Sequence, residues 1–143
     1  MTAQALFGPA NYLAMLGWLV LIAGVLMNRA WLRDKLAGIY WPLALSAGYC
    51  VAIYLGFGQS GGGFDSLPAV RQLFSNDWAL LAGWVHYLAF DLFIGAWIAR
   101  DAERSGLSRW LLIPVLPLTF LFGPAGLLLF QVFKTAFAKG AKS

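Results

Sequence analysis

Four apolar stretches, each of at least 20 residues, constrain this chain more than any other feature. They run over about 5–27, 36–57, 78–99 and 110–133 and contain one formal charge, Asp91, whereas the other 15 charged side chains lie outside them. A helix of this length crosses a hydrocarbon core about 30 Å thick at about 1.5 Å per residue. Helices of a soluble domain keep a polar face, which these stretches lack. The sequence therefore predicts an all-α integral membrane protein, a four-helix bundle in a single domain over residues 1–143.

The basic residues flank the predicted spans, so the formal net charge of +4 needs no nucleic-acid partner. Four spans place the first and third loops on one membrane side, and the positive-inside rule favours the cytoplasm for that side and the outside for both termini. The first span lacks a preceding basic residue and is long, so we expect it to be retained rather than cleaved. The first and third loops hold the basic residues Arg29, Arg33, Lys35, Arg100, Arg104 and Arg109, whereas the opposite membrane side holds Arg71, Lys134, Lys139 and Lys142.

A short helix lying in the membrane interface is expected between spans two and three. Apolar residues recur there at helical spacing from Leu67 to Phe74, with Asp65 or Ser66 as the N-cap and Pro68 in the first turn. Span two carries small residues at four-residue intervals, which let another helix approach closely. This second pattern predicts a packing face, either internal or between copies of a homo-oligomer, formed by Ala44, Gly48, Ala52 and Gly56.

Span three contains both ionisable side chains found inside a span, His86 and Asp91, each two or three residues from its centre. A charged carboxylate there costs several kcal/mol, so we expect Asp91 to be neutral, paired or facing a polar cavity. Positions five apart on a helix differ by about 140°, so the two side chains flank a groove and do not form a touching dyad. Tyr87 shares its face with Asp91, whereas His86 shares its face with Phe90 and other aromatic residues.

Span four is expected to be kinked, because Pro114, Pro117 and Pro124 each remove a helical N–H donor. Pro124 leaves the carbonyl of Phe120 without its helical partner near the middle of the membrane. Broken backbone is tolerated there when protein covers it or when it lines a cavity. If spans three and four are antiparallel neighbours, Asp91 lies level with Thr119, and we expect Thr119 or a freed carbonyl to form a hydrogen bond with Asp91.

Other kinds of site have less support. Asp91 and His86 can serve as structural clamps between helices, without chemistry. The spans offer one His, one Asp and one Cys in separate positions, too few for a zinc or di-iron centre. No cofactor is expected, and haem held axially by His86 is the alternative, although no second axial ligand is evident.

Several of these residues resemble a known family. The pair Phe74-Ser75, the block from Trp84 to Phe93 with its His-x4-Asp spacing, Asp101 and the block from Phe122 to Leu128 are similar to the abscisic-acid-deficient-four-like family. These are small membrane proteins of plant plastids and many bacteria. The resemblance implies a link to carotenoids, since plant members are required to make neoxanthin and are associated with cis-carotenoid formation, and we expect a bacterial inner-membrane member.

We therefore hypothesise that the protein binds a carotenoid or similar polyene between spans three and four and catalyses or assists its trans–cis isomerisation. Asp91 would be the acid and His86 would orient it or carry its proton. A non-enzymatic pigment-binding protein, or a scaffold for carotenoid enzymes or a photosynthetic complex, is the alternative. Four short spans with one acid and no repeat symmetry argue against a transporter. The expected substrate-binding residues are Trp84, Tyr87, Phe90, Phe93, Thr119 and Pro124.

Overall fold

A computed structural model describes residues 2–56, 58–59 and 61–137, and all regular elements within these ranges are helical. The element η1 is a π-helix that continues directly into α2, and η2 is a single 3₁₀ turn before α5. In chain order the elements are α1 (Ala3–Leu26), η1 (Trp31–Tyr40), α2 (Trp41–Gly56), α3 (Leu67–Leu73), α4 (Asp77–Arg104), η2 (Arg109–Leu111), α5 (Leu112–Phe122) and α6 (Pro124–Phe137).

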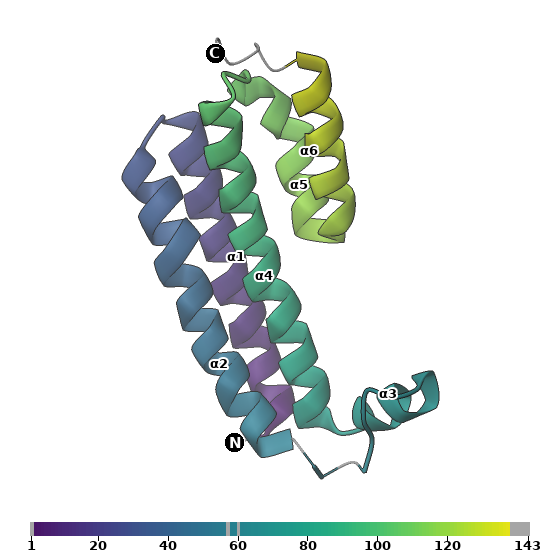
Figure 1. Cartoon of the computed structure of the whole chain (residues 1–143). Helices are drawn as coiled ribbons and strands as arrows, with labels where there is room; N and C mark the ends of the chain where they lie inside the picture. The colour runs from purple at the N-terminus through teal and green to yellow at the C-terminus, as the bar shows by residue number, and fades with distance from the viewer. Residues whose placement is uncertain (1, 57, 60, 138–143) are drawn as a thin grey trace.

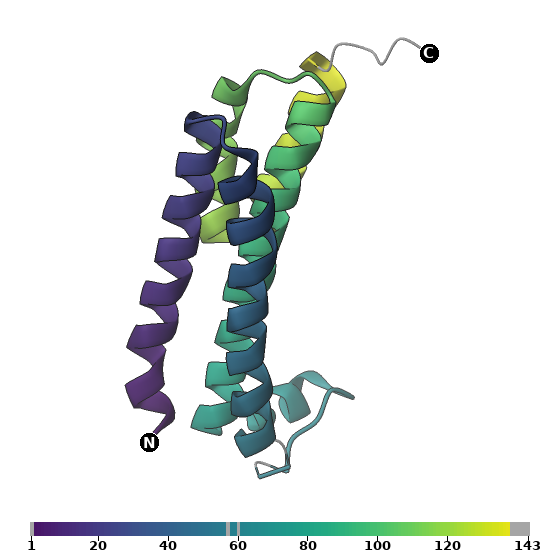
Figure 2. The same ribbon diagram turned by 90° about the vertical axis from the view of Figure 1, so that its left-hand side faces the viewer.

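Within the described residues, three helices are long and apolar enough to cross a membrane: α1, the continuous segment Trp31–Gly56, and α4. They lie side by side (Figures 1 and 2), and their bounds correspond to the first three apolar stretches of the sequence. Within the most hydrophobic part of each helix, 56% of the α4 residues are buried, against 33% in α1 and 28% in Trp31–Gly56. The helix that carries Asp91 is therefore the most buried of the three. The length and apolar character of all three helices indicate a membrane protein.

Glycines allow α1 to approach both of its long neighbours closely. A Cβ built on Gly95 of α4 would lie 2.5 Å from the ring of Trp18, and one built on Gly17 of α1 would lie 2.6 Å from the ring of Trp41. The Trp41 indole also donates a hydrogen bond of 2.6 Å to the carbonyl of Leu13. Since packing in a membrane depends on close van der Waals contact and on interhelical hydrogen bonds, these contacts fix α1 against α2 and α4.

The fourth apolar stretch does not form the kinked span that the sequence predicts. Helix α5 ends at Phe122, Gly123 turns the chain, and α6 returns beside α5 as a hairpin along one half of α4 (Figure 1). The 14 residues of α6 reach about 21 Å at 1.5 Å per residue, less than the hydrocarbon core. The prediction of both termini on one side is also wrong for the described residues, because α1 begins and α6 ends at opposite ends of the molecule (Figure 1).

Ion pairs hold the end of the molecule where α4 finishes. Lys134 on α6 forms an ion pair with Asp101 on α4, with 2.6 Å between Nζ and Oδ2, so the returning helix is anchored beside the end of α4. Arg33, which is buried, binds Asp34 and Glu103, and both contacts are 2.6 Å long. This second cluster joins the start of η1 to the last turn of α4.

The expected short helix and small-residue face have mixed outcomes. Helix α3 forms between α2 and α4, and its cap is Ser66, whose hydroxyl accepts a hydrogen bond from the amide of Ala69. In the small-residue stripe, Ala52 and Gly56 are buried, and a Cβ on Gly56 would lie 2.6 Å from the backbone of α4. Ala44 and Gly48 are exposed. The internal packing role is thus confirmed for one half of the stripe, and the homo-oligomer stays a prediction for the other half.

Candidate functional site

Asp91 lies at the middle of α4, fourteen residues from Asp77 and thirteen from Arg104. It is 8% exposed, and its Oδ2 atom has no hydrogen-bond partner among the described residues. Its carboxyl group lies against the turn of the hairpin, since a Cβ built on Gly123 would lie 2.5 Å from Oδ1. A buried carboxyl group with an unpaired oxygen is expensive in an apolar setting, so this position is a candidate for chemistry or for ligand binding.

The sequence of the turn explains why the hairpin reverses beside Asp91. Gly123 has a φ of 27° and a ψ of −85°, a conformation that side chains with a Cβ rarely adopt. Its amide donates to the carbonyl of Thr119 at 2.8 Å, and the amide of Leu127 donates to the Gly123 carbonyl at 3.2 Å. Gly126 sits directly on Thr119, where any Cβ would collide with that residue. Two glycines and a proline therefore produce a reversal where the sequence predicts a kink.

Tyr87 closes the hairpin turn from α4. Its hydroxyl group lies 3.0 Å from the carbonyl oxygen of Phe120 and 2.9 Å from that of Leu121, and it donates to these two acceptors. The same hydroxyl group also interacts electrostatically with the carboxyl group of Asp91. The Phe120 carbonyl is the one that Pro124 was predicted to free, so its need for a partner is confirmed.

The partner of that carbonyl differs from the prediction. Tyr87, not Asp91, reaches it, and the hydroxyl of Thr119 donates to the carbonyl of Val115 at 2.8 Å. The predicted hydrogen bond from Thr119 to Asp91 is therefore not formed. The cause is the register, because the hairpin brings Gly123, rather than Thr119, to the level of Asp91.

An aromatic row runs along α4 away from the hairpin turn. The rings of Tyr87 and Trp84 are 5.4 Å apart, and those of Trp84 and Phe7 on α1 are 5.8 Å apart. The Trp84 indole donates a 3.0 Å hydrogen bond to the side chain of Asn11. Phe7 and Trp84 also line a hollow of about 330 Å³ between α1 and the start of α4. Phe7 and Asn11 were not predicted from the sequence, which gave no indication of which face of α1 meets Trp84.

His86 lies on a different side of α4. Its ring stacks on Phe90 with centroids 4.7 Å apart and meets Tyr49 of α2 edge-on at 5.6 Å. Among the described residues, no hydrogen bond or ion pair joins it to Asp91. The expectation that the two side chains do not point to one spot is confirmed, and nothing in these contacts links His86 to the acid.

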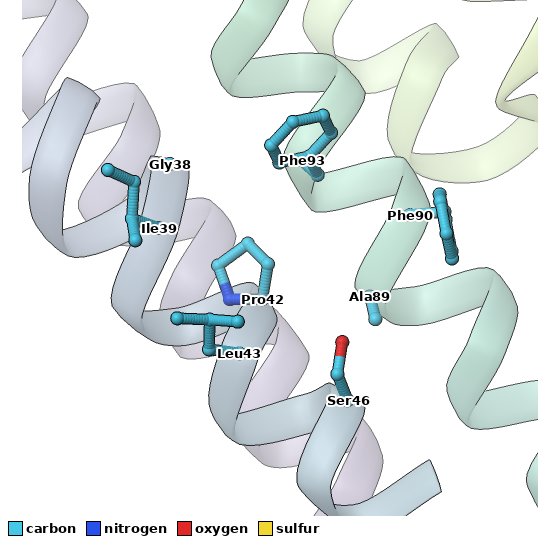
Figure 3. Close-up of a pocket in the computed structure, with 8 residues that line it drawn as sticks. All are labelled: Gly38, Ile39, Pro42, Leu43, Ser46, Ala89, Phe90 and Phe93. Atoms are coloured by element: carbon cyan, nitrogen blue, oxygen red, sulfur yellow. The ribbon is translucent and has the colours of Figure 1, made fainter. Parts of the chain in front are cut away.

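Phe90 and Phe93 belong to the same side as His86. They line an apolar groove of about 270 Å³ with Ala89 on α4, facing Pro42 and Ser46 across the gap to α2 (Figure 3). The groove also includes Gly38, Ile39 and Leu43. The predicted substrate-binding residues are thus divided: Trp84 and Tyr87 lie near the hairpin turn with Thr119 and Pro124, whereas Phe90 and Phe93 face α2.

Over the described ranges, no three His, Cys, Asp or Glu side chains come together in the way that metal ligands do. The model of the ABA DEFICIENT 4-like family matches residues 5–130 of the chain. No curated protein and no solved structure matches.

Proposed function

Because the chain belongs to the ABA DEFICIENT 4-like family, which indicates a role related to carotenoid and neoxanthin metabolism, we propose that it binds a polyene and catalyses or assists its trans–cis isomerisation. The observation that carries this proposal is Asp91, a buried acid with an unpaired oxygen at the centre of α4, beside the Gly123 turn. A long polyene is about as long as the bilayer is thick, so its central double bonds reach this depth.

The reaction that suits this acid is reversible protonation of the polyene. The O–H bond of a neutral Asp91 breaks while a C–H bond forms on a polyene carbon, and the positive charge spreads along the remaining double bonds. The former double bond rotates, and the proton then returns to the Asp91 carboxylate. Burial in an apolar setting favours a neutral acid, which this step requires.

The aromatic row Phe7–Trp84–Tyr87 is the proposed binding surface for the polyene. Its rings begin at the hairpin turn and continue along α4, and Trp84 and Phe7 are 39% and 44% exposed. Ring faces stabilise a nearby cation, so this row suits the charged intermediate. His86 contacts Phe90 and Tyr49 instead, on the side of α4 that faces α2, so we give it no part in proton transfer.

The test is expression of the full chain in bacteria that make carotenes, followed by separation of the pigment isomers. We expect the intact protein to raise the cis fraction and Asp91→Asn to abolish that rise. Asp65→Asn, which alters an exposed loop carboxylate, is the matched control and should leave the rise intact. Equal activity of the Asp91 and Asp65 variants would refute the acid mechanism.

Two aromatic variants locate the polyene. Trp84→Leu should reduce isomerisation strongly, and Phe93→Leu should reduce it little, because Phe93 lies in the groove that faces α2. The opposite result would place the polyene in that groove.

A non-enzymatic pigment-binding role is the second candidate, and the groove between α2 and α4 favours it. That groove is apolar, is lined by Phe90 and Phe93, and does not include Asp91 (Figure 3). Pigment that copurifies with unchanged isomer composition, and that is lost on Phe93→Leu but kept on Asp91→Asn, would support this role and exclude the isomerase.

A further inference from the structure

Two adjoining hollows lie where α1 ends and α5 begins. The first, of about 370 Å³, is apolar except for Arg109. It is lined by Ile22 and Val25 on α1 and, on α5, by Leu112, Ile113, Leu116 and Pro117. The second, of about 290 Å³, is mostly polar and is lined by Asn28, Arg33, Glu103 and Arg109 among others. Val25, Arg109 and Leu112 line both. Because the two hollows meet at these three residues, we treat them together as one amphipathic cleft, apolar along the helices and polar at their ends.

The charges of the polar hollow are unequally compensated. Arg33 is 5% exposed and is bound to Asp34 and Glu103 at 2.6 Å, so this cation has two acidic partners, and Arg100 and Arg104 also act electrostatically on Asp34. Arg109 is exposed and donates one hydrogen bond, 3.2 Å long, to the carbonyl of Leu26. Among the described residues no acidic group pairs with it. Arg109 is thus the uncompensated cation of the cleft.

The remaining donors of Arg109 suit a phosphate group. A guanidinium group carries five N–H donors in a planar fork that matches phosphate oxygens, and the Leu26 carbonyl uses one of them. Asn28, which lies in the turn after α1 and has a φ of 54°, also lines the polar hollow, and an asparagine amide is a second donor that suits phosphate. Trp110 is 62% exposed beside Arg109, with 5.9 Å from the guanidinium carbon to the ring centre. An exposed tryptophan beside an arginine is typical of the headgroup level of a membrane.

We propose that this cleft binds an anionic phospholipid, with its phosphate on Arg109 and Asn28 and an acyl chain in the apolar hollow between α1 and α5. Charge complementarity selects a lipid with a net negative charge, because one cation of the cleft is free of an acidic partner. The apolar hollow below selects a lipid over free phosphate, since phosphate uses the polar end alone. Such a lipid would hold the start of the hairpin against α1.

The test measures the thermal unfolding of the purified full chain in detergent against increasing phosphatidylglycerol, phosphatidylcholine or sodium phosphate. We expect phosphatidylglycerol to raise the Tm in a saturable manner, with phosphatidylcholine weaker and phosphate without effect at equal concentration. Arg109→Gln should weaken the apparent affinity for phosphatidylglycerol about tenfold or more, and Arg109→Lys should weaken it less. The matched control is Arg71→Gln on α3, an exposed basic residue at the other end of the molecule.

A variant of the apolar hollow separates lipid binding from anion binding. Ile113 is 55% exposed and lines that hollow, so Ile113→Trp fills it without altering a charge. We expect it to weaken phosphatidylglycerol binding as well. Any of three results would overturn the proposal. The first is an equal loss of phosphatidylglycerol affinity in Arg109→Gln and Arg71→Gln, the second is a rise in Tm with phosphate alone, and the third is unchanged lipid affinity in Ile113→Trp.

Discussion

The hydroxyl group of Tyr87 should be essential for the docking of the hairpin, and Tyr87→Phe tests this by removing one oxygen atom. In the intact chain this hydroxyl donates to the carbonyls of Phe120 and Leu121, at 3.0 and 2.9 Å. Pro124 cannot supply the helical N–H for the first of these carbonyls. The hydrocarbon interior offers no water as a substitute, so the variant leaves acceptors unpaired at the turn.

The expected loss follows from the cost of an unpaired carbonyl in apolar surroundings, about 1–3 kcal/mol. Taking the middle of that range, docking should weaken by about 2 kcal/mol, which corresponds to a change of about 30-fold in the opening equilibrium. The ring of phenylalanine keeps the packing against Trp84, which is 5.4 Å away, so little further loss comes from shape. The effect should also be local, because the hairpin lies beside α4, on the side away from α2 (Figure 1).

Amide hydrogen exchange in detergent micelles measures the opening directly. In Tyr87→Phe, exchange across residues 119–127 should accelerate about 30-fold, while exchange in α2 stays unchanged. Tyr54→Phe is the control, because Tyr54 is 83% exposed on α2. If the two variants exchange at the same rate across the turn, the hydroxyl group does not hold the hairpin and the reasoning fails.

Two further predictions concern the same hairpin. In titrations with a denaturing detergent, Gly123→Ala should lower the free energy of unfolding by more than Gly106→Ala does. Both positions have a positive φ, which costs a residue with a Cβ about 1–2 kcal/mol. At Gly123 the new Cβ also meets the carboxyl group of Asp91, whereas at Gly106 it faces open space. Equal losses would show that the contact with Asp91 is not tight. Lys134→Met and Asp101→Asn should show a coupling of about 0.5–1 kcal/mol in a double-mutant cycle, because their ion pair is half-buried. A coupling of zero would mean that this ion pair does not help to hold α6 beside α4.

Patterns within single segments of the sequence predicted the parts of the fold that depend on one segment alone. Apolar length alone located the three long helices, because crossing a membrane imposes a minimum length. The short helix α3 and its Ser66 cap followed from the spacing of apolar residues and from the proline in the first turn. The position of Asp91 within its helix, and the face opposite to His86, followed from helical geometry.

The hairpin could not be predicted in the same way, because its cause is tertiary. A 24-residue apolar stretch with three prolines has the same composition whether the chain kinks or reverses. The reversal depends on the positive-φ backbone of Gly123 and is stabilised by two contacts between residues far apart in the sequence, Tyr87 with Phe120 and Lys134 with Asp101. The position of the hairpin along α4 is also the reason that Tyr87, and not Asp91, forms the hydrogen bond with the carbonyl of Phe120.

The returning helix also gives the molecule a strong electrical polarity. Of the eight basic residues that the structure describes, seven lie at the end where α1, α4 and α6 finish, together with three acidic residues. The eighth, Arg71, lies at the other end with two acidic residues. A continuous fourth span would have carried Lys134 across the bilayer and reduced this difference. Because moving one elementary charge across 100 mV changes the energy by about 2.3 kcal/mol, insertion in the reverse orientation opposes the membrane potential of a cell with a negative interior. The turn at Gly123 thereby strengthens the preference for one orientation in the membrane, for which the positive-inside rule predicts the arginine-rich end in the cytoplasm.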